Sequence, residues 1–176
     1  MKYRQATAQD AAAIAVPHAD SWRRHYRGAC LDSYLDGDVT ADRMAEWTDR
    51  LSQARADWHT LIAESGDAVA GFAHVILDAD PIWGAYVDAL HVRHDMKRQG
   101  LGVRLIAETA RWVARSRSSS GIYLWVLEQN SAAQAFYTAQ GGSNVERQLA
   151  GPFPGGGRAY SFRYAWPDLS RLTSSE

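Results

Sequence analysis

A short glycine turn flanked by basic residues is the part of this sequence best suited to bind an anion. Lys97 and Arg98 precede Gly100 and Gly102, and Arg104 follows them, between an apolar run and a helical pattern. Glycine lets backbone N–H groups approach a phosphate closely, and the N-terminus of a helix adds a partial positive charge. The spacing therefore predicts a phosphate site between a strand and a helix.

Three interpretations of this turn compete. A dinucleotide fingerprint needs a third glycine where this chain has Leu105, and an acidic residue that would bind the ribose is not evident at the right distance. A P-loop needs four residues between its glycines and then Lys followed by Ser or Thr, and the sequence has no such string. An ordinary strand-to-helix turn uses glycine only for tightness. The turn alone does not decide between this last interpretation and another type of ligand site.

A second segment, one helix further along the chain, makes the pattern more specific. The strand-like run 122–127 is followed by Asn130-Ser-Ala-Ala133-Gln-Ala-Phe-Tyr137-Thr-Ala-Gln-Gly141-Gly142. This segment resembles the N-x-x-A-x-x-x-Y-x-x-x-G-F element of the GNAT N-acetyltransferase family. The glycine turn, Lys97-Arg-Gln-Gly100-Leu-Gly102, resembles that family's R/Q-x-x-G-x-G/A acetyl-CoA motif. Both motifs occur in the order and spacing of the family.

The resemblance extends over nearly the whole chain, with two departures. Residues 21–28 and Tyr34-Leu35 are similar to the family's W-x-x-x-Y-x-G and Y-L elements, and residues 71–75 are similar to its central G-F strand. Lys97 stands where Arg or Gln is usual, which loses a planar hydrogen-bonding group. Gly142 stands where Phe is usual, which removes an apolar anchor. These departures concern cofactor binding and packing, not the chemistry.

The resemblance implies an α/β fold: a single-domain, mixed, mostly antiparallel central sheet flanked by helices, with a splayed strand pair at the acetyl-CoA site. Apolar periodicity and turn residues place elements that agree with it. Pro17 predicts a kink in the first helix, or two shorter helices. We expect one N-acetyltransferase domain over residues 1–170 and a flexible tail over 171–176. The expected strands are 3–6, 60–64, 68–77, 85–92, 122–127, 145–149 and 159–166, and the expected helices are 7–26, 40–54, 102–115 and 130–140.

Composition and charge argue against several classes of protein. The net charge of -1 over 176 residues disfavours a nucleic-acid partner, because binding to phosphates depends on a basic face. No apolar run approaches the roughly 20 residues of a membrane helix, so we expect a cytoplasmic protein with no membrane partner. Cys30 is the only cysteine and the histidines form no H-E-x-x-H pattern, so we predict no structural metal. The sequence leaves open whether the protein forms a homodimer.

By resemblance, the cofactor contacts come mainly from the backbone. The N–H of Leu90 would stabilise the negative charge that develops on the acetyl oxygen, and Val92 would hold the pantetheine arm like an added strand. Asn130 would hydrogen-bond the cofactor arm or cap the following helix, and the two roles are compatible. The pyrophosphate would bind the backbone of Lys97, Arg98, Gln99, Gly100, Leu101, Gly102 and Val103.

Acetyl transfer to an amine needs a group that removes a proton. A primary amine with a pKa of about 10.4 is almost wholly protonated at pH 7, and deprotonation costs about 4 to 5 kcal/mol. Asp88 is the first candidate base, and strand alternation predicts that it shares a face with Tyr86, Leu90 and Val92. The alternative for Asp88 is a satisfied structural carboxylate. Glu128, near the end of its strand, is the second candidate, and its alternative is a solvated strand end.

Tyr137 is the candidate general acid. It follows Asn130 by seven residues, so about two helical turns return it to the same side of the helix. The resemblance implies that its hydroxyl lies near the sulfur of the cofactor. The alternative is a core aromatic beside Phe136.

The sequence is therefore identified as a member of the GNAT family. The implied activity is transfer of an acetyl group from acetyl-CoA to a primary amine of a small molecule or peptide, by direct attack in a ternary complex. The alternative is a non-catalytic acyl-CoA-binding or sensing module on the same fold. A third hypothesis is a nucleic-acid-binding domain that uses the basic cluster. The candidates for the acceptor pocket are Trp22, Tyr26 and Trp83, with core packing as the alternative for each.

Overall fold

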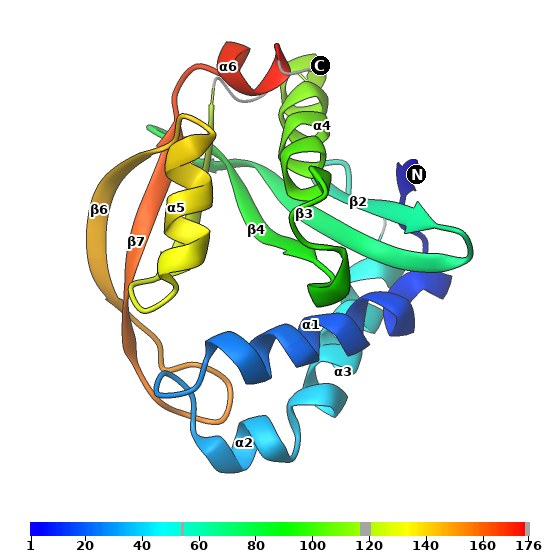
Figure 1. The fold of residues 1–176 in the computed structure, drawn as a ribbon, viewed down its shortest axis with the longest axis vertical. Helices are drawn as coiled ribbons and strands as arrows, with labels where there is room; N and C mark the ends of the chain where they lie inside the picture. The colour runs from blue at the N-terminus through cyan, green and yellow to red at the C-terminus, as the bar shows by residue number, and fades with distance from the viewer. Residues whose placement is uncertain (54, 117–120, 175–176) are drawn as a thin grey trace.

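Seven strands form one open sheet in the part of the chain that the computed structural model describes, which is residues 1–53, 55–116 and 121–174 (Figure 1). The strand order is β1-β2-β3-β4-β5-β7-β6, and neighbours are antiparallel except β4 and β5. This confirms the mixed, mostly antiparallel sheet predicted from the sequence. The strands are β1 (Lys2–Gln5), β2 (Trp58–Ser65), β3 (Ala68–Asp80), β4 (Gly84–Val92), β5 (Ile122–Leu127), β6 (Ser143–Ala150) and β7 (Ala159–Trp166).

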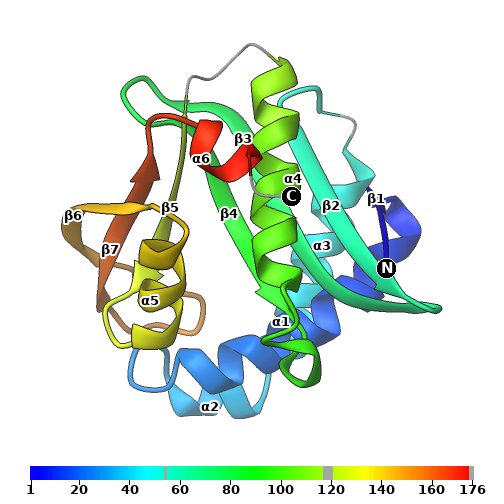
Figure 2. The same ribbon diagram turned by 45° about the horizontal axis from the view of Figure 1, so that its top comes forward.

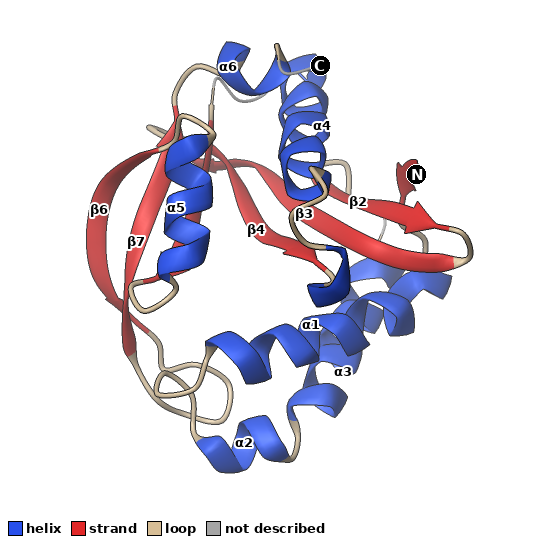
Figure 3. Cartoon of the chain, viewed as in Figure 1, coloured by secondary structure: helices blue, strands red, loops and turns tan. Residues whose placement is uncertain are grey.

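Helices cover both faces of this sheet (Figures 2 and 3). α1 and α3 pack on each other, and α1 lies against β3, whereas α4 lies against β2, β3 and β4. Helix α5 contacts β6, and α6 contacts α4. None of the helices in the described residues is long and apolar enough to cross a membrane. The helices are α1 (Ala11–His25), α2 (Asp32–Asp36), α3 (Val39–Ser52), α4 (Leu101–Ser116), α5 (Ser131–Ala139) and α6 (Ser170–Thr173).

Successive residues of β2 show that α1 and α4 lie on opposite faces. Leu61 packs with Leu105 of α4, whereas its neighbour Ile62 packs with Ile14 of α1 and Trp47 of α3. Side chains alternate across a strand, so the two helical layers bury the two faces of the same strands. Burial on both faces explains why the central strands are apolar nearly throughout.

The two parallel neighbours, β4 and β5, separate soon after they meet. Their pairing is limited to Ala85 with Ile122 and Tyr86 with Tyr123. Beyond Tyr86 the strands diverge, and Figure 2 shows the gap between their ribbons opening toward α1. The splayed strand pair expected from the family resemblance is confirmed.

A β-bulge in β4 overturns the predicted alternation around Asp88. His74 of β3 pairs with Ala89 and the next residue, Val75, pairs with Val87, so Asp88 is an extra residue in β4. A bulge places two residues opposite one and reverses the facing of those that follow. Leu90 consequently packs with the clusters under α4, whereas Asp88 contacts α3.

The first helix and the C-terminus are resolved in more detail than the sequence allows. α1 is one helix with Pro17 inside it, rather than two shorter helices. At the C-terminus, α6 covers Ser170–Thr173, and Leu172 is 2% exposed because α6 packs on α4. The tail expected from residue 171 is therefore helical as far as residue 173. The expected helix end at residue 54, and residues 175–176, lie outside the described residues.

Trp166 explains why the chain has Gly142 where the family usually has Phe. A Cβ atom on Gly142 would lie 2.5 Å from Cζ2 of Trp166, an indole that is 1% exposed. The indole N–H donates a hydrogen bond of 3.0 Å to the carbonyl of Gln140, which holds the ring in place. Trp166 of β7 thus fills the space beside Gly142. It supplies the apolar packing that Phe at position 142 usually provides in the family.

Candidate active site

The splay between β4 and β5 contains a cavity of about 110 Å³. Its walls come from α1, β4, β5, the residue before α5, and α5 itself. Six of the residues predicted from the sequence line it, which are Trp22, Tyr26, Asp88, Leu90, Asn130 and Tyr137. The structure therefore brings together the candidate base, the candidate acid and two candidate acceptor contacts in one cleft.

The backbone of β4 presents donors to the open side of the splay. The N–H of Arg93, just past the strand, donates to the carbonyl of Ala70 on the β3 side. Backbone N–H groups of successive residues in a strand point to alternate edges, so those of Val92 and Leu90 point toward β5. Because β5 does not pair with β4 beyond Tyr86, these groups face the cleft.

The glycine turn after β4 has backbone torsion angles that favour glycine. Arg98 and Gly100 have φ angles of 62° and 78°, in the left-handed region. An added Cβ at Gly100 would meet no protein atom within 4 Å, so the torsion angle rather than protein crowding requires glycine there. Helix α4 begins at Leu101, and the first N–H groups of a helix have no partner within it. With the exposed side chain of Lys97 beside it, the turn suits an anion.

The start of α4 packs closely against α5, and Asn130 caps α5. A Cβ on Gly102 would lie 3.3 Å from Cζ of Phe136 on α5. Asn130 caps α5, because its side-chain oxygen accepts a hydrogen bond of 3.2 Å from the N–H of Ala133. The N-cap alternative for Asn130 is therefore correct, and the same residue also lines the cleft.

Tyr137 belongs both to the core and to the wall of the cleft. Its side chain is 8% exposed, and its ring contacts those of Phe136, Tyr164 and Trp166. Burial raises the pKa of its hydroxyl above the usual value, with a smaller contribution from Tyr26. Tyr137 therefore keeps its proton at neutral pH, as a hydrogen-bond donor in the cleft must.

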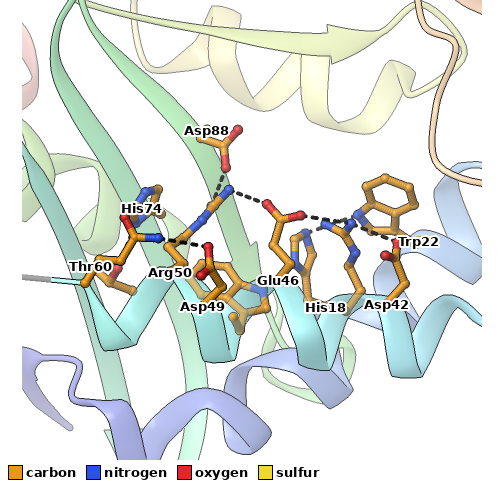
Figure 4. A network of polar contacts seen from close by, with 12 residues as sticks. His18, Trp22, Asp42, Glu46, Asp49, Arg50, Thr60, His74 and Asp88 are labelled. Atoms are coloured by element: carbon orange, nitrogen blue, oxygen red, sulfur yellow. Dashed lines mark hydrogen bonds and ion pairs between the residues drawn. The ribbon is translucent and has the colours of Figure 1, made fainter.

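Asp88 is held by an arginine that sequence analysis missed. Nη1 of Arg50 on α3 lies 2.5 Å from the Asp88 carboxylate, and Nη2 lies 2.6 Å from Glu46 (Figure 4). Arg50 and Asp88 are 38 positions apart, so local spacing carries no signal of this pair. The only sequence signal is that Arg50 follows Trp47 by three residues on an amphipathic helix.

Tyr26 and Tyr86 lie near the carboxylate of Asp88, and each stacks on a second aromatic ring. Trp22 and Tyr26 stack with ring centroids 4.3 Å apart, and Tyr86 stacks on Tyr123 at 5.1 Å. Burial, with Asp88 as the next cause, raises the pKa of Tyr26 to about 12 and also raises the pKa of Tyr86. Both hydroxyls are therefore neutral beside the carboxylate at physiological pH.

Three histidines in the cleft were also missed. His18 and His25 lie two turns apart on α1, a helical spacing that could have indicated a shared face, and His91 lies on β4. Burial is the main cause that lowers the pKa of each ring, to about 4 for His91. These side chains are neutral at pH 7, so they add no positive charge to the cleft.

Of the catalytic and acceptor-pocket candidates, Glu128 and Trp83 lie away from the cleft. Glu128 is exposed, and both its carboxylate oxygens accept hydrogen bonds of 2.9 Å from Arg147 on β6. Trp83 lies at the turn between β3 and β4, where its backbone N–H donates to Asp80 at 3.0 Å. This turn precedes β4, whereas the glycine turn follows it. Neither residue lines the cavity. Within the described residues, no group of three or more His, Cys, Asp or Glu could hold a metal ion.

Comparison with known proteins agrees with this arrangement. The profile of the acetyltransferase (GNAT) family matches residues 20–141, which include the glycine turn and Tyr137. The probable N-acetyltransferase Rv2775 of Mycobacterium tuberculosis is 32% identical over 143 residues, which cover 78% of this chain and 76% of that protein. The uncharacterized N-acetyltransferase YuaI of Bacillus subtilis is 28% identical over 174 residues, which cover 96% of this chain and 94% of that protein.

Solved structures show the same fold. The crystal structure of the PaiA N-acetyltransferase from Thermoplasma acidophilum, in complex with coenzyme A, superposes with a TM-score of 0.72. Sequence identity is 17%, and the superposition covers 94% of this chain and 98% of that one. With its family profile, its relatives and its splayed sheet in agreement, the chain belongs to the GNAT acetyltransferase family.

Proposed function

We propose that the protein transfers an acetyl group from acetyl-CoA to a primary amine of a small molecule or peptide, by direct attack within a ternary complex. The observation that carries this proposal is the splayed strand pair, because it turns backbone donors of β4 toward a cleft beside an anion-binding turn. Family membership supports acetyl transfer. The coenzyme A bound in the Thermoplasma PaiA structure supports the choice of cofactor.

Backbone groups hold acetyl-CoA in this proposal. The N–H of Leu90 donates a hydrogen bond to the acetyl oxygen as negative charge develops there, and Val92 holds the pantetheine arm. The backbone of residues 97–103 binds the pyrophosphate, and the side chains of Lys97 and Arg98 add positive charge. Asn130, which is fixed by its capping hydrogen bond, lies beside the arm.

The reaction forms a C–N bond and breaks a C–S bond. The neutral amine attacks the acetyl carbon, and collapse of the tetrahedral intermediate releases the thiolate of coenzyme A. Tyr137 donates its hydroxyl hydrogen to that thiolate. The conjugate acid of a thiolate has a pKa of about 8.5, below that of the buried tyrosine, so much of this contribution is a hydrogen bond to the developing charge.

Asp88 receives the proton that the amine loses, either directly or through water. The ion pair with Arg50 means that the amine must compete with a guanidinium for the carboxylate. Glu128 is occupied by Arg147 at the surface, which leaves Asp88 as the carboxylate that lines the cleft. Trp22 and Tyr26 line the same cleft and add apolar surface for the acceptor beside this carboxylate.

A thiol-release assay with a panel of amines tests the proposal. Free coenzyme A should appear only when both acetyl-CoA and an accepted amine are present, and mass spectrometry should find the amine heavier by one acetyl group. Calorimetry with acetyl-CoA alone separates the alternatives. Tight binding of acetyl-CoA without thiol release for any amine or peptide in the panel would favour the non-catalytic acyl-CoA-binding module.

A further inference from the structure

A second and larger cavity, of about 370 Å³, lies on the other side of Arg50 from the active-site cleft. It is enclosed by the end of β1, the end of α3 with the segment after it, and the neighbouring strands β2 and β3. No residue of the glycine turn or of α5 takes part in it. Its lining consists of Gln5, Ala6, Arg50, Leu51, Gln53, Arg55, Ala56, Trp58, Thr60 and His74.

Two guanidinium groups line this cavity, and their acidic partners lie outside the lining. Arg50 and Arg55 contribute guanidinium groups, and no Asp or Glu is among the described residues that line the cavity. Arg55 lies 4.5 Å above the ring of Trp58, which orients it, and pairs with Asp57 outside the lining at 2.7 Å. Leu51 and Trp58 add apolar surface. Such a lining fits an anion that carries a carbon skeleton better than it fits a cation or a bare ion.

His74 adds an unsatisfied hydrogen-bonding atom. The side chain is 1% exposed, and its Nδ1 atom lies 2.7 Å from the hydroxyl of Thr60, while Nε2 has no partner. Burial, with Arg50 as the next cause, lowers the pKa of His74 to about 3, so the ring is neutral. The hydroxyl of Thr60 and Nδ1 share one hydrogen bond, whose direction is set by the tautomer of the ring. A buried polar atom without a partner is uncommon, and His74 carries one in the wall of the cavity.

We propose that this cavity binds a small organic carboxylate, whose oxygens accept hydrogen bonds from Arg50 and Arg55. A guanidinium has five N–H donors, and Asp88 and Glu46 use Nη1 and Nη2 of Arg50. A carboxylate in the cavity shares Arg50 with Asp88 and weakens its hold on the base. The ligand therefore activates acetyl transfer. This coupling rests on the proposed function, whereas the binding itself does not.

Isothermal titration calorimetry of the full-length protein tests the site, with benzoate, hexanoate and citrate as probes and inorganic phosphate for comparison. We expect at least one organic probe to bind with a Kd below about 1 mM and more tightly than phosphate. Arg55→Gln should weaken that binding by at least about tenfold, since a charge-assisted hydrogen bond is lost.

Arg93→Gln is the matched control. Arg93 forms two hydrogen bonds with Asp95, two positions further on, just as Arg55 does with Asp57, and both pairs have a contact of 2.7 Å. The side chain of Arg93 is 40% exposed and that of Arg55 is 46% exposed. It does not line the cavity, so its substitution should leave binding of the organic probes unchanged. Equal loss in Arg93→Gln and Arg55→Gln, or phosphate binding as tight as the best organic probe, overturns the assignment. Absence of binding by all three organic probes does the same.

The coupling to Asp88 is measured separately. At saturating acetyl-CoA, the bound probe should raise kcat/KM for the amine by about fivefold or more. The same probe should bind Asp88→Asn but leave its residual rate unchanged. A probe that binds the wild type without changing its rate refutes the coupling and leaves the site in place. A protein that binds the probe but acetylates no amine instead counts against the proposed function, because calorimetry needs no turnover.

Discussion

Asp88 and Arg50 form an ion pair of 2.5 Å that joins the candidate base on β4 to helix α3. Their side chains are 26% and 14% exposed, so the pair is partly shielded from water. The guanidinium is shared with Glu46 at 2.6 Å. The base is consequently not a free carboxylate in the cleft. Its availability to an amine depends on how firmly α3 holds it.

Replacement of Asp88 separates a catalytic role from a structural one. We expect Asp88→Asn to lower kcat/KM for the amine by about 100- to 10,000-fold, since the group that receives the proton is lost. Affinity for acetyl-CoA should stay unchanged, because the glycine turn is not altered. Initial rates of thiol release and calorimetry with acetyl-CoA measure the two quantities.

Asp80→Asn is the matched control for Asp88→Asn. Asp80 pairs with Arg163 at 2.8 Å, and these side chains are 21% and 13% exposed, close to the values for Asp88 and Arg50. Asp80 does not line the cleft. Both variants should therefore lose similar stability, whereas only Asp88→Asn should lose activity. Equal losses of activity would identify Asp88 as a structural carboxylate.

We expect acetyl-CoA binding to depend on Gly100 of the glycine turn. We expect Gly100→Val to cost about 1 to 2 kcal/mol of folding stability, because valine is strained at a φ of 78°. It should also weaken acetyl-CoA binding strongly, since the side chain would crowd the phosphate and shift the N–H groups around it. Calorimetry and thermal unfolding measure the two effects.

Gly66→Val controls for the backbone strain. Gly66 has a φ of 61° in the turn between β2 and β3, and, as at Gly100, an added Cβ would meet no atom within 4 Å. The two variants should lose similar stability, but Gly66→Val should bind acetyl-CoA like the wild type. Wild-type affinity in a folded Gly100→Val protein would instead remove the turn from the cofactor site.

The features that the sequence predicts correctly depend on neighbours along the chain. The left-handed turn at Gly100 and the cap at Asn130 each arise within a few residues, where local backbone geometry decides. Strand and helix positions follow from apolar periodicity for the same reason. Tyr137 falls in the cleft because a seven-residue spacing on one helix fixes its direction.

The features that the sequence does not predict come from contacts between distant elements. The bulge at Asp88 depends on its pairing with β3, and no local pattern marks an extra residue in a strand. Arg50 meets Asp88 only because α3 packs over the sheet. Likewise, Trp166 fills the space beside Gly142 from a strand 24 positions later. The position of Glu128 at a strand end suggests a catalytic base, but the ion pair with Arg147 of β6 holds it at the surface, and local sequence does not predict that pair.

Stability should decrease as pH falls through the range in which His74 would be protonated in the unfolded chain. The pKa of His74 is lowered to about 3 in the folded protein, against an ordinary value near 6.5. Between these values the unfolded chain binds more protons, so the stabilisation is complete above about pH 6.5 and is lost as pH falls toward 3. One such histidine contributes a slope of up to about 1.4 kcal/mol per pH unit.

Urea denaturation at about pH 7, 6 and 5 measures this slope. His74→Phe should reduce the dependence of unfolding free energy on pH, because the titrating group is absent. His94→Phe is the control, since His94 is an exposed histidine. A slope that is the same in His74→Phe and the wild type would assign the acid sensitivity to other groups, of which His59 and His91 are the next candidates.

Tyr137→Phe tests the general acid by removing one oxygen and keeping the ring. We expect kcat to fall by about 10- to 1000-fold, with acetyl-CoA affinity and folding little changed, because the ring contacts with Tyr164 and Trp166 remain. The pKa of Tyr137 is raised by burial, so its acid form persists as pH rises. The wild-type rate should therefore show no loss from deprotonation of Tyr137 up to about pH 10.

Tyr164→Phe is the control for the loss of a buried phenol. Tyr164 is 5% exposed, its ring lies 5.7 Å from that of Tyr137, and its hydroxyl accepts a hydrogen bond of 3.5 Å from Thr138. It does not line the cleft, so Tyr164→Phe should retain turnover even where it alters stability. If Tyr137→Phe also turned over at the wild-type rate, Tyr137 would be a packing residue. The thiolate of coenzyme A would then take its proton from water, which reaches the cleft through the open side of the splay.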